Sequence, residues 1–197
     1  AIGVALAAVG AIAFSGKAII VKLAYRHGVD AVTLIMYRML FALPFFLGMA
    51  WWAGRGKAPL SRRDWVGVVG LGFSGYYLSS MLDFAGLQYI SASLERLILY
   101  LGPTLVLLLN WALKGQRVSR GQLLAMSVSY AGALLVFGVE LRLVPSGAIA
   151  WGALLVFLST ISYSVYLFFS GEFVQRIGAL RLGGWATGVA CLFCIAQ

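Results

Sequence analysis

Long apolar stretches, each of the length that crosses a lipid bilayer, run through almost the whole chain. A helix needs ~20 apolar residues to cross the hydrocarbon core, and 62% of the 197 residues are hydrophobic while only 11% are charged. A soluble domain has a much more polar composition. The sequence therefore predicts an all-α, polytopic bundle of transmembrane helices whose main partner is the lipid bilayer. We expect spans at residues 2–24, 31–52, 64–82, 90–113, 121–139, 148–170 and 183 onward.

Basic residues are concentrated on every second connection between these spans. Nine Lys and Arg residues lie on the connections after spans two, four and six, whereas the connections after spans one, three and five carry only Arg26 and Arg142. Because positive residues accumulate on cytoplasmic loops, we expect a multi-pass protein of the cell inner membrane with a cytoplasmic N-terminus. This pattern also accounts for the net charge of +9, and we expect no nucleic-acid partner.

Two similar turns suggest an internal repeat. Arg26-His27-Gly28-Val29 joins spans one and two, and Arg176-Ile177-Gly178-Ala179 joins spans six and seven, 150 residues later. Five spans per repeat is an odd number, so the second copy must enter the membrane upside down, as in many secondary transporters. We expect a first five-helix repeat at 1–142 and the truncated start of a second repeat at 147–197. The chain is then expected to be a fragment of a protein with ten helices.

Four charged residues lie within the expected spans, away from their ends: Lys17, Arg38, Glu95 and Arg96. Charges inside a bilayer are costly and face the bundle interior or a wet cavity. By their position along the spans, all four lie in the outer half of the membrane, and three cations against one carboxylate favour an anionic or zwitterionic small-molecule substrate. The alternative is that Glu95 pairs with Lys17 or Arg38 to hold helices together. Since adjacent helical residues project about 100° apart, we expect Glu95 and Arg96 to be poor partners for each other.

Polar residues also recur on one face of several spans, which favours a cavity over lipid contact. Hydrogen bonding between helices is the alternative explanation. The residues expected to line a pathway, in addition to the charged ones, are Tyr76, Tyr100, Ser162, Tyr163 and Tyr166. In the middle of span four, Pro103 removes a helical hydrogen bond, so Gly102 and Pro103 are a candidate hinge.

The sequence lacks the groupings that catalysis or metal binding requires. Cys191 and Cys194 lie at i,i+3 spacing in the last apolar run, but no further His or Cys completes a metal set, so we interpret them as apolar packing. His27, the only histidine, lies in a loop. We therefore expect no metal, no cofactor and no enzymatic activity.

Two segments resemble the EamA-type branch of the drug/metabolite transporter superfamily. They are AFSGKAIIVKLAYRHGVDAVTLIMYR and GLQYISASLERLILYLGPTLVLLLNWALKGQRVS. The resemblance implies ten helices in two inverted repeats, a central pathway and export or exchange of small metabolites such as amino acids. By this resemblance Arg38 matches the Arg of the second span and Pro103 the Pro of the fourth. The family often has Glu at the positions of Gly102 and Gln116. The family's carboxylate role in proton coupling is therefore not carried over to these positions, and Glu95 is a candidate for that role.

Together these observations predict a secondary active transporter that moves a small polar metabolite by alternating access, as an exporter or exchanger. A homodimer is among the expected assemblies. The alternative is a structural or regulatory membrane protein that does not transport.

Overall fold

Helices account for all the regular structure in the described part of the chain. The computed structural model describes residues 4, 8–10, 12, 16–137 and 147–197, and no strand occurs among them. Four helical segments in this part are long and apolar enough to cross a membrane: Ala31–Gly54, Ala92–Lys114, Gly147–Ile177 and Ala179–Ala196. The predicted spans at 2–24 and 121–139 fall partly outside the described residues.

A tight turn joins α2 to α3. α2 (Lys17–Arg26) ends before a turn in which Gly28 has a φ of 79°, and α3 (Ala31–Gly54) follows. The carboxylate of Asp30 caps α3 by accepting a hydrogen bond from the Thr33 backbone N–H at 3.1 Å, which satisfies one of the unpaired donors of the first turn. The bonds from Thr33 hold the pKa of Asp30 below its ordinary value.

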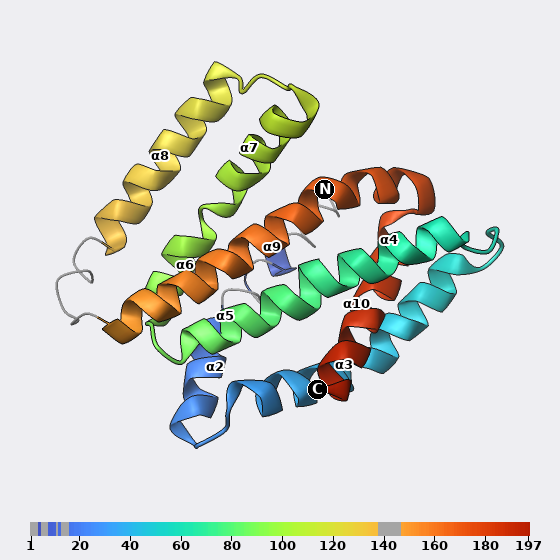
Figure 1. Ribbon diagram of the computed structural model, residues 1–197, viewed down its shortest axis with the longest axis horizontal. Helices are drawn as coiled ribbons and strands as arrows, with labels where there is room; N and C mark the ends of the chain where they lie inside the picture. Colours follow the sequence, from blue (N-terminus) through green and yellow to red (C-terminus); the bar gives the residue numbers. More distant parts are fainter. Residues whose placement is uncertain (1–3, 5–7, 11, 13–15, 138–146) are drawn as a thin grey trace.

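The predicted third span lies within a longer helical rod. α4 (Arg62–Gly72), the π-helical turn η1 (Phe73–Leu78) and α5 (Ser79–Leu87) continue one another along the green rod in Figure 1. A capping box formed by Ser61 and Asp64 begins it. The helix runs five residues beyond the predicted end at residue 82, so Asp83 lies inside the bundle rather than in a loop.

The predicted fourth span is broken at its centre. α6 (Ala92–Leu99) ends before a turn at Tyr100 and Leu101, and α7 (Gly102–Lys114) restarts with Pro103 in its first turn. Proline is tolerated there because the first turn of a helix has no internal acceptor for its N–H. α8 (Arg120–Phe137) then runs back beside α7, and the pair stands at the upper left of Figure 1.

The last two helices pack against the first half of the chain. α9 (Gly147–Ile177) lies against α5, η1, α6 and α7, while α10 (Ala179–Ala196) packs most extensively against α3. α10 begins four residues before the predicted position, directly after Gly178, whose φ of 89° makes the turn possible.

Cys191 and Cys194 lie in a core between α3, α5 and α10, with Ile35 and Phe84. Both cysteines are free and fully buried, and the Cys191 thiol is 3.6 Å from the sulfur of Met39. Their interpretation as packing residues is confirmed.

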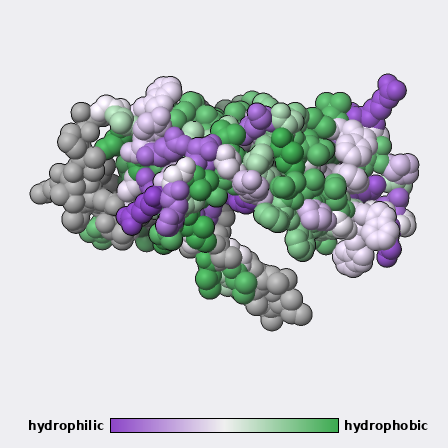
Figure 2. Space-filling view, turned by 90° about the horizontal axis from the view of Figure 1, so that it is seen from below, coloured by the Kyte–Doolittle hydropathy of each residue, from purple (hydrophilic) through white to green (hydrophobic). Residues whose placement is uncertain are grey.

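The outer surface is largely apolar. Figure 2 shows a broad hydrophobic area over the middle of one face, a hydrophilic group to its left, and further hydrophilic side chains at the right-hand end, where Figure 1 places the connection between α3 and α4. Large side chains such as Phe41, Phe45 and Leu135 are more than 70% exposed. A surface of this kind suits contact with lipid chains rather than water.

Candidate functional site

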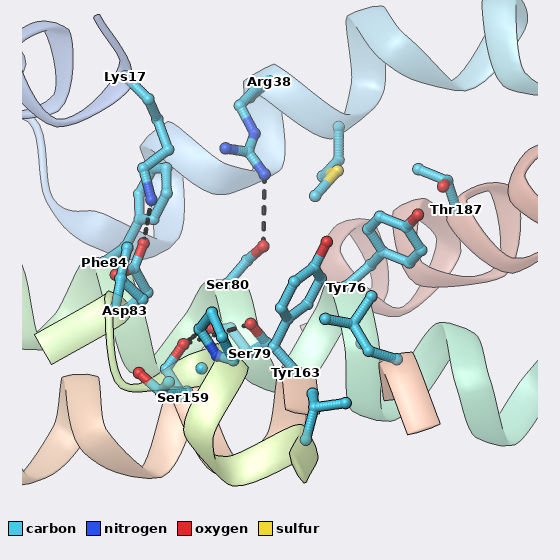
Figure 3. A pocket seen from close by; sticks show the side chains of 18 of the residues that line it. Lys17, Arg38, Tyr76, Ser79, Ser80, Asp83, Phe84, Ser159, Tyr163 and Thr187 are labelled. Carbon is cyan, nitrogen blue, oxygen red and sulfur yellow. Dashed lines mark hydrogen bonds and ion pairs between the residues drawn. The ribbon is translucent and has the colours of Figure 1, made fainter. Parts of the chain in front are cut away.

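A cavity of about 1010 Å³ lies between the helices and receives side chains from α2, α3, η1 and α5 to α10. Apolar side chains form much of its wall, including Phe46 of α3 and Leu107 of α7. Most of the polar lining residues carry hydroxyl groups, and the charged ones gather at one side (Figure 3). The polar lining consists of Lys17, Arg38, Tyr76, Ser79, Ser80, Asp83, Gln122, Ser159, Thr160, Tyr163 and Thr187.

Lys17 joins two carboxylates at the edge of this cavity. Its ammonium group forms an ion pair with Oδ2 of Asp83 and lies 3.1 Å from Oε1 of Glu95. Glu95 is fully buried and does not line the cavity. Glu95 therefore pairs with Lys17, which is the alternative that the sequence analysis gave for this residue.

Two of the sequence-based expectations about these charges are wrong. Arg96 Nε lies 3.2 Å from Oε2 of Glu95, because the two long side chains bend toward each other across their helical offset. In addition, Asp83 belongs to the same charged layer, so the layer holds three cations and two carboxylates. The excess of positive charge is smaller than the sequence suggested.

Arg38 is held differently from the other two cations. Its Nη2 lies 3.4 Å from the Ser80 hydroxyl, and its guanidinium carbon lies 4.9 Å from the centre of the Phe84 ring. Among the described residues no carboxylate comes within ion-pair distance of Arg38. Figure 3 shows its side chain pointing into the cavity toward Ser80. A cation over an aromatic face is stabilised, but its capacity to bind an anion remains unused.

A group of tyrosines lies further along the cavity. The hydroxyls of Tyr76 and Tyr166 are 3.0 Å apart, and the rings of Tyr163 and Tyr166 are 5.5 Å apart. Tyr76 and Tyr163 line the cavity, whereas Tyr166 does not and is only 8% exposed. Hydrogen bonding between helices and cavity lining therefore occur together on this face.

The remaining predicted pathway residues lie outside the described lining. The Ser162 hydroxyl donates to the backbone carbonyl of Ser74 at 2.8 Å, which joins α9 to η1. Tyr100 lies in the turn between α6 and α7 and is half exposed, and Arg96 contacts Glu95. Neither of these two residues lines the cavity.

The break between α6 and α7 borders the cavity. Leu99, Gly102 and Pro103 all line it. From α8, the Tyr130 hydroxyl contacts the Thr104 hydroxyl and lies 3.4 Å from the Tyr100 carbonyl oxygen. The interruption predicted from Pro103 is present, while its role as a hinge stays a prediction.

Polar residues that the sequence analysis did not select also reach the cavity. Ser80 and Asp83 follow Tyr76 at four and seven residues, the spacing of one helical face, so this spacing is the signal that could have identified them. Gln122 on α8 and Thr187 on α10 had no comparable pattern. Within the described residues, no three His, Cys, Asp or Glu side chains are grouped closely enough to hold a metal ion.

Further ion pairs join the helices far from this charged layer. Arg176 near the end of α9 pairs with Asp64 at the start of α4, and Lys114 Nζ lies 3.5 Å from Oε1 of Glu172. The Arg181 guanidinium donates to the Ala58 carbonyl at 2.9 Å. The contacts of Arg176 and Arg181 tie the connection between α3 and α4 to the turn between α9 and α10, whereas the Lys114–Glu172 pair joins the end of α7 to α9.

Comparison with known proteins gives the family. The chain is 31% identical over 186 residues to the uncharacterized transporter YcbK of Bacillus subtilis (strain 168), covering 92% of this chain and 58% of the relative. It is 23% identical over 182 residues to an uncharacterized transporter of Archaeoglobus fulgidus, covering 92% of this chain and 62% of that relative. The chain thus spans about three fifths of the length of these curated relatives, and no solved structure matches it. The EamA-like transporter family matches residues 1–138, and the chain belongs to that family.

Proposed function

We propose that this protein is a secondary transporter that moves a small, carboxylate-bearing metabolite by alternating access, with Arg38 as the anchor of the substrate carboxylate. Membership of a transporter family and a multi-helix bundle compatible with a membrane support the general activity. The observation that carries the choice of substrate is the guanidinium of Arg38, which faces the cavity without a carboxylate partner among the described residues.

The cost of a charge in a membrane makes this observation informative. A charged side chain at the centre of a transmembrane helix costs ~2.5–3.5 kcal/mol on insertion scales. Lys17 and Arg96 offset that cost with carboxylates at short range. Arg38 contacts a hydroxyl and a ring instead. A substrate carboxylate would supply the paired hydrogen bonds for which the planar guanidinium is suited.

The proposed orientation rests on the charge pattern, and the proposed conformational change rests on the helix break. With the basic connections in the cytoplasm, the N-terminus is cytoplasmic and the charged layer lies in the outer half of the inner membrane. The interruption at Gly102 and Pro103 borders the cavity, and a bend there would expose the site to one side at a time. Export or exchange of the substrate is the activity that the resemblance to EamA-type transporters implies.

Uptake by the full-length protein in lipid vesicles tests the proposal. Arg38→Ala should lower the uptake of the best substrate in a panel of radiolabelled amino acids and monocarboxylates by about tenfold or more, since a hydrogen bond to a charged group contributes roughly 1.5–3 kcal/mol. Insertion into the membrane should be unchanged.

Arg26→Ala is the matched control, because it removes the same charge from an exposed position that does not line the cavity. Unchanged uptake after Arg38→Ala would refute the assigned role. Failure of the unaltered protein to move any member of the panel would favour the alternative, a membrane protein whose polar faces serve only to join helices.

A further inference from the structure

A strongly basic surface lies at the end of the bundle where the chain passes from α3 to α4. Four basic residues occur within nine positions of this connection, and all four are exposed. Figure 2 shows hydrophilic side chains at this end of the molecule, next to the hydrophobic area. The four residues, referred to below as the basic surface, are Arg55, Lys57, Arg62 and Arg63.

The charges of the basic surface are not neutralised within the described part of the chain. None of its four side chains has a carboxylate within ion-pair distance there. The neighbouring acidic residue, Asp64, pairs instead with Arg176 and accepts a hydrogen bond from the Ser61 hydroxyl at 2.6 Å. The basic surface is therefore free to bind an anion from outside the chain.

The turn between α9 and α10 adds to this concentration of positive charge. The Arg181 guanidinium donates to the Ala58 carbonyl at 2.9 Å, and its Nε is buried and donates to none of the described residues. Lys57 Nζ lies 3.6 Å from the position that a Cβ of Gly178 would occupy. Cations from both connections therefore meet at this end of the bundle.

Two exposed tryptophans mark the depth of the basic surface in the membrane. Trp51 and Trp52 lie in the last turn of α3 and are 62% and 63% exposed, and tryptophan side chains favour the headgroup region of a bilayer. The guanidinium carbon of Arg55 lies 3.8 Å from the centre of the Trp51 ring, a contact that stabilises the cation. This contact places the Arg55 charge at the level of the lipid headgroups.

We propose that the basic surface binds the headgroup of an anionic phospholipid in the cytoplasmic leaflet, whose phosphate oxygens accept hydrogen bonds from the guanidinium and ammonium groups. Basic residues beside a membrane span attract anionic lipids, and a planar guanidinium matches the geometry of a phosphate. Phe41, Phe45 and Trp52 follow helical spacing on one exposed face of α3, and this face contacts the acyl chains.

The inference goes beyond the proposed function, because none of the four residues of the basic surface lines the cavity. Native mass spectrometry of the full-length protein in detergent tests it. The probes are phosphatidylglycerol and phosphatidylcholine with identical acyl chains, which differ in the net charge of the headgroup. We expect the unaltered protein to bind phosphatidylglycerol at least tenfold more tightly.

The paired substitution Lys57→Gln and Arg62→Gln removes two cations of the basic surface. It should weaken the binding of phosphatidylglycerol by about tenfold or more, since each basic residue near an anionic membrane surface strengthens binding by roughly fivefold. Affinity for phosphatidylcholine should be unchanged. Phosphatidylglycerol binding that survives this paired substitution would overturn the assignment.

Arg117→Gln with Arg120→Gln is the matched control. Both arginines are exposed, and Arg120 begins α8 as Arg62 begins α4. Each double variant keeps seven of the nine basic residues on the predicted cytoplasmic connections. The control should change the Kd for phosphatidylglycerol by less than threefold. An equal loss in the two double variants would mean that the summed charge alone attracts the lipid, and would overturn the assignment.

Two measurements on the unaltered protein decide the question even if a variant does not fold. Equal affinity for the two lipids would exclude a site for an anionic headgroup. Displacement of bound phosphatidylglycerol by the same concentration of free glycerol phosphate would assign the basic surface to a soluble phosphate and refute lipid binding. Persistence of the bound lipid under that competition supports the proposal.

Discussion

The close approach of α5 and α9 makes Gly152→Ala the most informative test of the packing. A Cβ at position 152 would lie 2.7 Å from Cβ of Tyr89, 2.8 Å from Cγ2 of Ile90 and 2.9 Å from the carbonyl oxygen of Gly86. Ordinary contact begins at 3.4 Å, so the shortest of these distances requires a shift of about 0.7 Å. The neighbouring atoms belong to backbone or stiff parts of side chains, so the helices themselves must separate.

This separation has a calculable consequence along the interface. The hydroxyl oxygens of Ser79 and Ser159 are 3.2 Å apart. Moving the two helices apart by about 0.7 Å would take these oxygens beyond hydrogen-bonding distance. Overpacking a tight interface costs about 1–3 kcal/mol. We therefore expect Gly152→Ala to lower the apparent melting temperature of the detergent-purified protein by several degrees.

Gly171→Ala on the same helix provides the control. Nothing lies within 4 Å of a Cβ at position 171, and alanine is favoured over glycine in a helix by up to ~1 kcal/mol. That variant should melt at the same temperature as the unaltered protein or slightly above it. If Gly152→Ala proved as stable as Gly171→Ala, the inferred close approach of α5 and α9 would be refuted.

Three further predictions concern the charges and the cysteines. Lys17→Met leaves two buried carboxylates without their shared cation, and should destabilise the protein by about 3–5 kcal/mol, measured by thermal unfolding; a change below 1 kcal/mol would contradict the observed ion pairs. Arg176→Ala removes a partly exposed pair and should lower the melting temperature slightly, by an amount that shrinks in high salt. Cys191 and Cys194 are fully buried and should react with maleimide only after unfolding; rapid labelling of the native protein would contradict this.

The helices were predictable because the bilayer imposes a length and an apolar composition on each of them. The predicted spans at 31–52 and 148–170 correspond to α3 and α9, although α9 extends to Ile177. Boundaries were less accurate because hydropathy falls at a polar residue even where the helix continues. Asp83 lies one residue beyond the predicted end at residue 82 for this reason, and the predicted charged layer therefore omits its second carboxylate.

The candidate site was only partly predictable for a related reason. A polar face identifies which residues point into the bundle, but the neighbouring helix decides whether a given side chain meets a cavity or a backbone. Tyr163 and Ser162 are adjacent in the sequence, yet Tyr163 lines the cavity and Ser162 bonds to the Ser74 carbonyl. Likewise, the pairing of Glu95 with Arg96 depends on side-chain conformations that helical spacing does not specify.

The most direct test of the central claim is whether the cavity is a water-filled path that a carboxylate enters. Tyr163 and Leu158 on α9 are each 41% exposed, and only Tyr163 lines the cavity. In the full-length protein in membranes, Tyr163→Cys should react with a charged, water-soluble thiol reagent, and a transported carboxylate should slow the reaction. Leu158→Cys should stay unreactive. Equal reactivity at the two positions, or no protection at position 163, would contradict the proposed pathway.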